Sequence, residues 1–275
     1  MTVCINGQFF SPDEAKISIF DHGLLYGDGV FDTIAAVDGE IWWLDEHLER
    51  LLQGCNSILL KHPWSKSELS KLAKETFLQT NQPNGRIRIT ITRGVGDIPS
   101  YSINSCQPNL IIFSTPLDFP QESTYLKGLS IKSINYSRVF PNVKNLSFLP
   151  SVLGNIEAKK TGYDDSVFVN ESKNVTEGTT WNIFVLTDNK LITPKDSLLV
   201  GVTRNKVIEL SESLGISVEK SLIPLEMLYS SQEIFITGTT KRILGITKVD
   251  DFTVGNGGIG NLTSKLLKEY RRIFY

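Results

Sequence analysis

Residues 86–92 constrain the fold most, because isoleucines alternate strictly with polar residues along this segment. Successive side chains of a strand point to opposite faces of a sheet, so the alternation predicts a strand with one buried face and one polar face. A sheet built from such strands must bury its apolar face against another layer. The chain is therefore expected to contain at least one half-buried sheet.

Further strands and helices are predicted on both sides of this segment. Short runs rich in β-branched and aromatic residues predict strands at 3–6, 29–34, 41–44, 109–114, 129–134, 166–169, 182–187, 191–192, 218–220 and 233–237. Apolar residues at helical spacing predict helices over 46–59, 67–80, 149–160, 203–214 and 262–272. Because the strands outnumber the helices and cluster in groups, an α+β fold is favoured over a regular βαβ series.

The chain of 275 residues is long enough for two domains. Residues 116–127 contain two prolines and several polar residues, which is typical of a linker. We therefore expect an N-terminal α+β domain over residues 1–117, a linker over 118–127 and a C-terminal domain over 128–275.

Composition excludes several classes of protein. The formal net charge of −2 argues against general binding to nucleic acid or to anionic membranes. The apolar runs are too short to cross a bilayer, and the first residues lack the basic start and apolar core of a signal peptide. We expect a soluble, cytoplasmic protein that acts on small molecules, with no nucleic-acid partner and no membrane partner.

The cysteines and histidines predict neither disulfides nor a metal site. The odd number of widely spaced cysteines does not suggest a disulfide framework, and reduced thiols are typical of the cytoplasm. The three histidines show no paired ligand spacing, so no metal is expected. The chemistry of the chain must therefore come from other residue types.

Six segments together resemble the class IV (fold-type IV) pyridoxal-phosphate enzymes. This family includes branched-chain aminotransferases, D-amino-acid aminotransferases and aminodeoxychorismate lyase. The segments occur in the family's order, at residues 19–34, 47–51, 142–150, 175–184, 201–204 and 237–240. The resemblance implies a smaller N-terminal α/β sandwich, a larger C-terminal mixed β pseudo-barrel with helices, a pyridoxal 5'-phosphate cofactor and a homodimer.

Lys144 corresponds to the lysine that forms the Schiff base in this family. The chemistry requires an amine that can become neutral, attack the cofactor aldehyde and move a proton at the substrate's α-carbon. Lys144 lies between Pro141 and Pro150 among apolar neighbours. From its sequence context alone it could equally be an ordinary solvated lysine. The resemblance makes it the predicted catalytic residue.

Glu177 resembles the family's carboxylate that pairs with the pyridine nitrogen of the cofactor. A protonated ring nitrogen makes the cofactor an electron sink, and a carboxylate beside it keeps the proton in place. Because Gly178 follows directly, the residues alone also allow a solvated glutamate in a hairpin turn. The resemblance assigns Glu177 to cofactor binding.

The resemblance also implies residues that bind the phosphate and the ring. Arg50 matches the phosphate arginine, whose planar fork can engage two oxygens. Val202 and Thr203 open a helix, where free N–H groups bind phosphate, although Thr203 could instead be a simple N-cap. Thr239 matches a phosphate-binding hydroxyl or a turn residue, and Asn182 is expected to help hold the ring or to serve as a core-facing turn residue.

Four residues are predicted to bind the substrate. Backbone amides near Thr239 and Thr240 hold part of the substrate carboxylate in the family, and Arg88 on the alternating strand is the candidate to assist them. Arg88 could equally lie on a solvated face. Phe31 is expected to line the side-chain pocket.

The expected reaction moves an amino group between an amino acid, branched-chain-like or otherwise small, and a 2-oxo acid. One alternative is a 4-amino-4-deoxychorismate lyase that releases pyruvate and 4-aminobenzoate, and a remote alternative is an inactive protein that only binds the cofactor. Branched-chain enzymes usually have Phe-Glu-Gly where this chain has Phe31, Asp32 and Thr33. The lyase tolerates threonine at position 33, so the sequence leaves these alternatives open.

Overall fold

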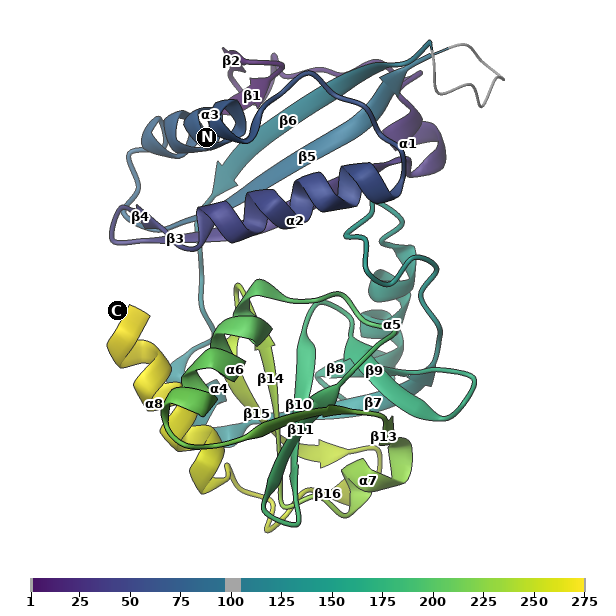
Figure 1. The fold of residues 1–275 in the computed structure, drawn as a ribbon, viewed down its shortest axis with the longest axis vertical. Coiled ribbons are helices and arrows are strands. Elements are labelled where there is room, and N and C mark those ends of the chain that lie inside the picture. The colour runs from purple at the N-terminus through teal and green to yellow at the C-terminus, as the bar shows by residue number, and fades with distance from the viewer. Residues whose placement is uncertain (1, 97–104, 275) are drawn as a thin grey trace. The chain divides into compact units, whose positions relative to one another are not determined.

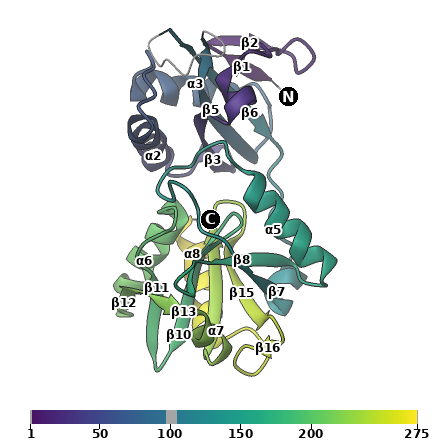
Figure 2. The same cartoon turned by 90° about the vertical axis from the view of Figure 1, so that its right-hand side faces the viewer.

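The computed structural model describes residues 2–96 and 105–274. The chain forms two compact units. The first comprises Met1–Asp118 and Val143–Ser147, and the second comprises Phe119–Asn142 and Phe148–Tyr275. Figures 1 and 2 label the helices and strands of both units.

The first unit is a six-stranded antiparallel sheet in the order β2-β1-β6-β5-β3-β4. Its strands are β1 (Val3–Ile5), β2 (Gln8–Phe10), β3 (Gly29–Val37), β4 (Glu40–Ile41), β5 (Gly85–Val95) and β6 (Gln107–Thr115). Its helices are α1 (His22–Tyr26), α2 (Leu44–Ser57) and α3 (Lys66–Leu78). Helices α2 and α3 pack on the sheet and on each other (Figure 1).

Burial confirms the predicted alternation in the first half of β5, whereas Thr90 and Thr92 in the second half are buried as well. Ile87, Ile89 and Ile91 are fully buried and join a core formed with α2 and α3. Arg86 is exposed and Arg88 is half-buried on the opposite face. Burying each isoleucine contributes about 1.5–3 kcal/mol, so this pattern fixes which face of β5 meets the helices.

The helix boundaries follow local chemistry. The spacing of Ser65 and Glu68 in the sequence predicts a weak capping box, and the two residues form it at the start of α3. The predicted strand over 41–44 was wrong beyond Ile41. Trp43 has a φ of 52°, in the left-handed region, which ends the pairing with β3 and turns the chain into α2.

The second unit is a ten-stranded mixed sheet that curls into a nearly closed barrel. The strand order is β12-β11-β10-β14-β15-β7-β8-β9-β13, with β16 paired to β15. Its strands are β7 (Leu129–Asn135), β8 (Asp165–Val169), β9 (Asn174–Gly178), β10 (Asn182–Thr187), β11 (Lys190–Pro194), β12 (Val218–Ser221), β13 (Ile223–Pro224), β14 (Glu233–Gly238), β15 (Arg242–Val249) and β16 (Phe252–Thr253).

Five helices surround this sheet. They are α4 (Glu122–Lys127), α5 (Leu149–Lys160), α6 (Val202–Ser213), α7 (Leu225–Tyr229) and α8 (Asn261–Phe274). Helix α5 packs on β7 and β8, whereas α6 and α8 pack on each other and on β14 (Figures 1 and 2). Isoleucines and valines from β10, β14 and β15 form the centre of the core. The predicted α+β class, with a smaller sandwich and a larger mixed barrel, is confirmed.

The unit boundary differs from the expected domain division in two ways. Residues 118–127, expected to be a linker, contain α4. Residues Val143–Ser147, expected in the second domain, belong to the first unit because Asn145 forms a β-bridge with Val30 and Val143 joins the first core.

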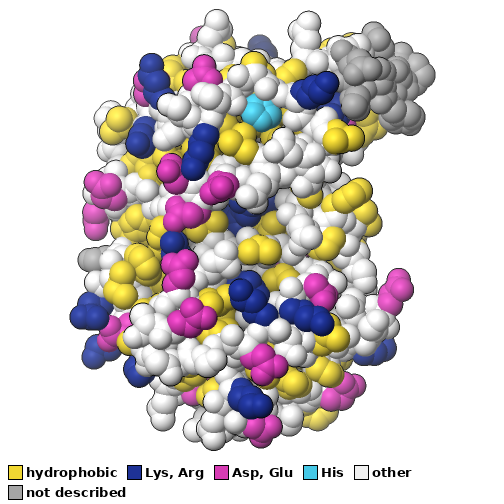
Figure 3. Space-filling model, in the orientation of Figure 1, with side chains coloured by type: hydrophobic (Ala, Val, Ile, Leu, Met, Phe, Trp, Pro, Cys, Tyr) yellow, Lys and Arg dark blue, Asp and Glu magenta, His cyan; other side chains and the backbone are white. Residues whose placement is uncertain are grey.

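In the parts of the chain that the structure describes, no helix has the length and apolar character needed to cross a membrane. Acidic and basic side chains are interspersed on the face that Figure 3 shows.

Candidate active site

Lys144 is held against β3 in the first unit. The Phe31 N–H donates to the Lys144 carbonyl over 2.9 Å, and the Leu146 N–H donates to the Gly29 carbonyl over 3.0 Å. These two bonds flank Lys144, so its backbone is fixed as part of the sheet edge. The ammonium nitrogen lies 4.8 Å from the centroid of the Phe31 ring.

Arg88 brings a second cation to the same aromatic ring. Its guanidinium carbon lies 3.7 Å from the Phe31 centroid. Burial lowers the pKa of Arg88, and Arg86 lowers it further, while Asp32 opposes this effect. Among the described residues, the Arg88 side chain has no hydrogen-bond or ion-pair partner besides its contact with the Phe31 ring. A half-buried arginine of this kind can receive a carboxylate ligand.

Arg50 lies on α2 and is fixed by the buried carboxylate of Asp32. Arg50 Nε donates to Asp32 Oδ2 over 2.9 Å, and Nη2 donates to Oδ1 over 2.7 Å. His47 Nδ1 lies 2.8 Å from the same Oδ1. Although burial opposes it, the charge of Arg50 and the His47 contact hold the pKa of Asp32 well below its usual range. The arginine is therefore oriented by an ionised partner.

Glu177 lies on β9 in the second unit and is buried, with an exposed fraction of 3%. Its Oε1 lies 2.6 Å from Arg138 Nε, and its Oε2 accepts the Leu199 N–H over 3.2 Å. Burial and these partners exclude the alternative of a solvated turn residue. Sequence reasoning missed Arg138, which also donates to Ser151 Oγ over 3.1 Å. No local pattern distinguished this arginine from a surface residue.

The N-terminus of α6 has the features of an anion site. Gly201 is the N-cap and contributes no side-chain hydrogen bond, so the interpretation of Thr203 as the N-cap was wrong. The Thr203 hydroxyl is buried and has no hydrogen-bond partner among the described residues, and the same holds for Thr237. Orphan N–H groups at a helix start and a buried hydroxyl suit a phosphate group.

Asn182 supports the loop that precedes α6. Its Nδ2 donates to the Leu199 carbonyl over 2.8 Å, and a Cβ on Gly201 would lie only 2.1 Å from its Oδ1. The Leu199 N–H in turn donates to Glu177. Asn182 therefore holds Leu199, the backbone partner of Glu177, in the loop that leads into α6. Asn182 also pairs with Thr237 across β10 and β14, which brings three segments of the second unit together.

Thr239 and Thr240 lie in the hairpin between β14 and β15. Gly238 pairs with Arg242, so residues 239–241 form the connection. Both threonines are partly exposed. The predicted residues of the second unit thus gather at neighbouring ends of β9, β10 and β14 and at the start of α6, while those of the first unit gather around β3, β5 and α2.

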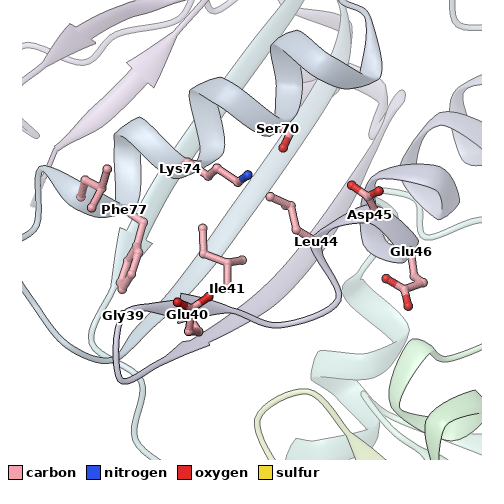
Figure 4. A pocket seen from close by; sticks show the side chains of 10 residues that line it. Gly39, Glu40, Ile41, Leu44, Asp45, Glu46, Ser70, Lys74 and Phe77 are labelled. Atoms are coloured by element: carbon pink, nitrogen blue, oxygen red, sulfur yellow. The ribbon is translucent and has the colours of Figure 1, made fainter. Parts of the chain in front are cut away.

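A groove elsewhere in the first unit contains none of the predicted site residues. It has a volume of about 440 Å³ and lies beside α2, α3 and the β3–β4 turn. Figure 4 shows Lys74 extending from α3 above Ile41, with Phe77 at one end of the groove and Asp45 and Glu46 at the other. This groove is therefore separate from the residues that the sequence predicts for the active site.

Comparison with known proteins identifies the family. The family model of class IV aminotransferases matches residues 29–249. The chain belongs to the class IV aminotransferases. It is 35% identical to a protein of Methanocaldococcus jannaschii that carries the provisional name branched-chain-amino-acid aminotransferase, over 99% of this chain and 96% of that protein. It is 28% identical to the D-alanine aminotransferase of Staphylococcus haemolyticus, over 98% and 96% of the two chains.

Solved structures of aminotransferases share the fold. The branched-chain aminotransferase of Thermoproteus uzoniensis, solved with norvaline, superposes with a TM-score of 0.92 at 30% identity, covering 99% of this chain and 94% of that one. The Escherichia coli branched-chain amino acid aminotransferase gives a TM-score of 0.92 at 25% identity, with the same coverage.

This class IV aminotransferase is an enzyme that uses pyridoxal 5'-phosphate, as the sequence predicted. The residues present fit that group. In the first unit, the fixed Arg50 guanidinium suits a phosphate, and Lys144, fixed to β3, suits an aldehyde. In the second unit, the orphan Thr203 hydroxyl at the start of α6 suits a phosphate, and the buried Glu177 carboxylate suits a ring nitrogen. The relatives are aminotransferases, so the lyase alternative is not favoured.

Proposed function

We propose that Lys144 is the catalytic lysine of this aminotransferase. The carrying observation is the backbone pairing that fixes Lys144 to β3 and sets its amine 4.8 Å from the Phe31 ring. The Arg88 guanidinium contacts the same ring. A neutral amine at this place can attach to the cofactor and then accept the α-proton of an amino acid.

The same proposal gives each cofactor-binding residue one role. Arg50 and the α6 start, with Val202 and Thr203, bind the phosphate, and Thr239 adds a hydroxyl to it. Glu177 holds a proton at the pyridine nitrogen, which lets the bound cofactor withdraw electrons from the α-carbon. Asn182 holds the loop beside Glu177, as its bond to the Leu199 carbonyl supports.

The substrate residues are Phe31, Arg88, Thr239 and Thr240. Arg88 pairs with a substrate carboxylate, since no described residue already neutralises it. The backbone of Thr239 and Thr240 contributes donors to a carboxylate, and Phe31 packs against the side chain. These roles suit a small or branched aliphatic amino acid and a 2-oxo acid. The names of the relatives, branched-chain and D-alanine aminotransferase, support that substrate class.

The working form is a homodimer in the cytoplasm. Helix α5 exposes Leu149, Val152, Leu153 and Ile156, which are spaced to form one apolar stripe. Large exposed apolar surfaces mark interaction sites, and a second copy of this chain is the proposed occupant. Three free cysteines support a reducing compartment.

The test compares Lys144→Ala with Lys160→Ala, a matched exposed lysine at the end of α5. We expect the wild type and Lys160→Ala to bind pyridoxal phosphate with a visible absorption band that Lys144→Ala lacks. Transfer from leucine or D-alanine to 2-oxoglutarate should disappear only in Lys144→Ala. A full visible band in Lys144→Ala would overturn the assignment, and pyruvate release from aminodeoxychorismate would favour the lyase instead.

A further inference from the structure

One buried carboxylate of the second unit joins two segments that the proposed site uses. Asp165, at the start of β8, is 3% exposed. Its Oδ1 accepts hydrogen bonds from the Thr179 hydroxyl over 2.7 Å and from Asn155 Nδ2 over 3.2 Å. Its Oδ2 accepts from Trp181 Nε1 over 2.8 Å and from Lys241 Nζ over 2.7 Å. Thr179 and Trp181 follow Glu177, whereas Lys241 follows the Thr239–Thr240 pair.

The first of these segments, the turn after Glu177, is tightly packed. A Cβ on Gly178 would lie 2.1–2.3 Å from three atoms of the Trp181 indole, so the indole lies directly on the backbone beside Glu177. The Asp165 carboxylate accepts from this indole and from the Thr179 hydroxyl. It therefore fixes the two residues that surround the turn after Glu177.

The second segment is the 239–241 hairpin between β14 and β15. The Lys241 N–H donates to the Gly238 carbonyl over 3.0 Å, and the Tyr125 hydroxyl donates to the Lys241 carbonyl over 3.2 Å. Arg242 closes the hairpin at a φ of 58°, where hairpins of this length normally have glycine. Its guanidinium stacks on Phe119 at 3.6 Å, which offsets part of that cost. The Lys241 side chain adds a tether from the hairpin to the barrel.

The ion pair between Lys241 and Asp165 is shielded from solvent. The side chains are 24% and 4% exposed. Although burial alone would raise it, the Lys241 charge and the hydrogen bonds keep the pKa of Asp165 below its usual range. Salt screens a buried pair much less than a surface pair, so this contact can hold a fixed geometry.

We propose that Asp165 is a positioning residue, which acts through Lys241 to fix the 239–241 hairpin against the segment after Glu177. This fixes the Thr239 and Thr240 backbone in the orientation that binds the substrate carboxylate. The inference rests on the proposed function for the role of these two threonines. The tether itself depends only on contacts within the second unit.

An electrostatic role and a positioning role of Asp165 predict opposite changes in anion binding when Asp165 is replaced. Removing the Lys241 charge weakens anion binding under either role. Replacing Asp165 by asparagine removes a negative charge and keeps the lysine, so electrostatics alone would strengthen anion binding. Positioning requires both changes to weaken it, because either one releases the hairpin.

The experiment compares Asp165→Asn, Lys241→Met and Lys241→Arg with Lys248→Met. Lys248 is an exposed lysine on β15, the strand that follows the hairpin, and serves as the matched control. Binding of 4-methylvalerate to the cofactor-loaded protein is measured by calorimetry. Cofactor affinity is measured by absorbance titration, and backbone hydrogen exchange of residues 236–244 is followed with and without cofactor.

We expect Asp165→Asn and Lys241→Met each to weaken 4-methylvalerate binding roughly tenfold, as for loss of one charged hydrogen bond. Exchange in residues 236–244 should accelerate by a similar factor in both variants. Cofactor affinity should fall less than acid binding, because Arg50 and α6 hold the phosphate and only the Thr239 hydroxyl comes from the hairpin. Lys241→Arg should restore acid binding, and Lys248→Met should match the wild type.

Unchanged exchange in both variants would overturn the tether, and tighter acid binding by Asp165→Asn would overturn the positioning role. If Asp165→Asn fails to fold, hydrogen exchange of residues 236–244 in Lys241→Met decides, because loss of the charge alone would leave that exchange unchanged. A wild type that takes up no pyridoxal phosphate would refute the proposed function, while exchange in the cofactor-free protein would still accept or reject the tether.

Discussion

Arg50 and Asp32 form a two-point ion pair, in which both donor nitrogens of one guanidinium edge meet the two oxygens of one carboxylate. Asp32 is fully buried and the Arg50 side chain is 13% exposed. The arginine is thus ordered by the protein before any ligand arrives. Ordering a side chain in advance reduces the entropy cost of binding, so this pair should favour high phosphate affinity.

Substituting Arg50 by lysine should weaken pyridoxal phosphate binding about 10–100-fold, the range expected for losing a charge-assisted hydrogen bond of 1.5–3 kcal/mol. Absorbance titration measures the affinity. Binding of unphosphorylated pyridoxal should change little, because Arg50 is assigned to the phosphate. Arg86→Lys, at an exposed arginine of β5, should bind both compounds like the wild type. An equal loss for pyridoxal would contradict the assignment.

The free energy of unfolding should decrease in two stages as the pH is lowered. Burial lowers the pKa of His47 in the folded state, although Asp32 opposes this effect. In the unfolded state His47 has its ordinary pKa of about 6.5, so below that pH the unfolded state binds the proton more readily than the folded state. Stability is therefore lost as pH falls from about 7 through the lowered value in the folded state. The lowered pKa of Asp32 gives a second loss below about pH 4, since that carboxylate must be protonated.

Urea unfolding of the wild type and His47→Gln between pH 7 and 5 tests the first stage. The variant should start less stable and show a flatter decline. His62→Gln is the comparison, because burial also lowers the pKa of this less buried histidine, and it should flatten the decline less. A decline as steep in His47→Gln as in the wild type would rule out this source.

Substituting Gly201 by alanine should displace Asn182, because the new Cβ would lie 2.1 Å from the Asn182 oxygen. We expect a loss of about 1–3 kcal/mol in stability, as for overpacking, together with weaker cofactor binding. Thermal unfolding and absorbance titration measure the two effects. Gly258→Ala, in the turn before α8, should be close to neutral because it meets only an exposed asparagine at 3.3 Å. Normal cofactor affinity in Gly201→Ala would argue against a role for this loop.

Substituting Leu153 by glutamate should dissociate the proposed dimer. Leu153 is 55% exposed at the centre of the apolar stripe on α5, so the fold itself should tolerate the charge. Light scattering after gel filtration measures the mass. Leu126→Glu, at a leucine of α4 that is 79% exposed, is the control and should keep the wild-type mass. A dimer that survives Leu153→Glu would place the interface elsewhere.

Local patterns predicted much of the fold. The isoleucines of β5 and the box of Ser65 and Glu68 each depend on neighbours a few residues away, so sequence spacing was enough to find them. Trp43 could not be predicted in the same way. Its left-handed backbone conformation is uncommon for a bulky aromatic residue, and it was expected to continue a strand.

Resemblance selected Lys144, Arg50 and Glu177 as candidate site residues, but their supporting partners came only from the structure. Asp32 and Arg50 are 18 positions apart, and Lys241 and Asp165 are 76 positions apart. Contacts over such separations leave no periodic pattern in one sequence. The burial of Glu177 likewise depends on where β9 lies in the sheet, which the glycine after it did not reveal.

The short segment Val143–Ser147 has a consequence for how this chain can be divided. The polypeptide passes between the units after residues 118, 142 and 147, so cutting the gene at residue 118 would leave Lys144 on the fragment that lacks β3. Neither fragment would then contain all the residues of one unit. Reassembly would require the segment Val143–Ser147 to pair with β3 again. An exchange of whole domains between relatives would meet the same obstacle.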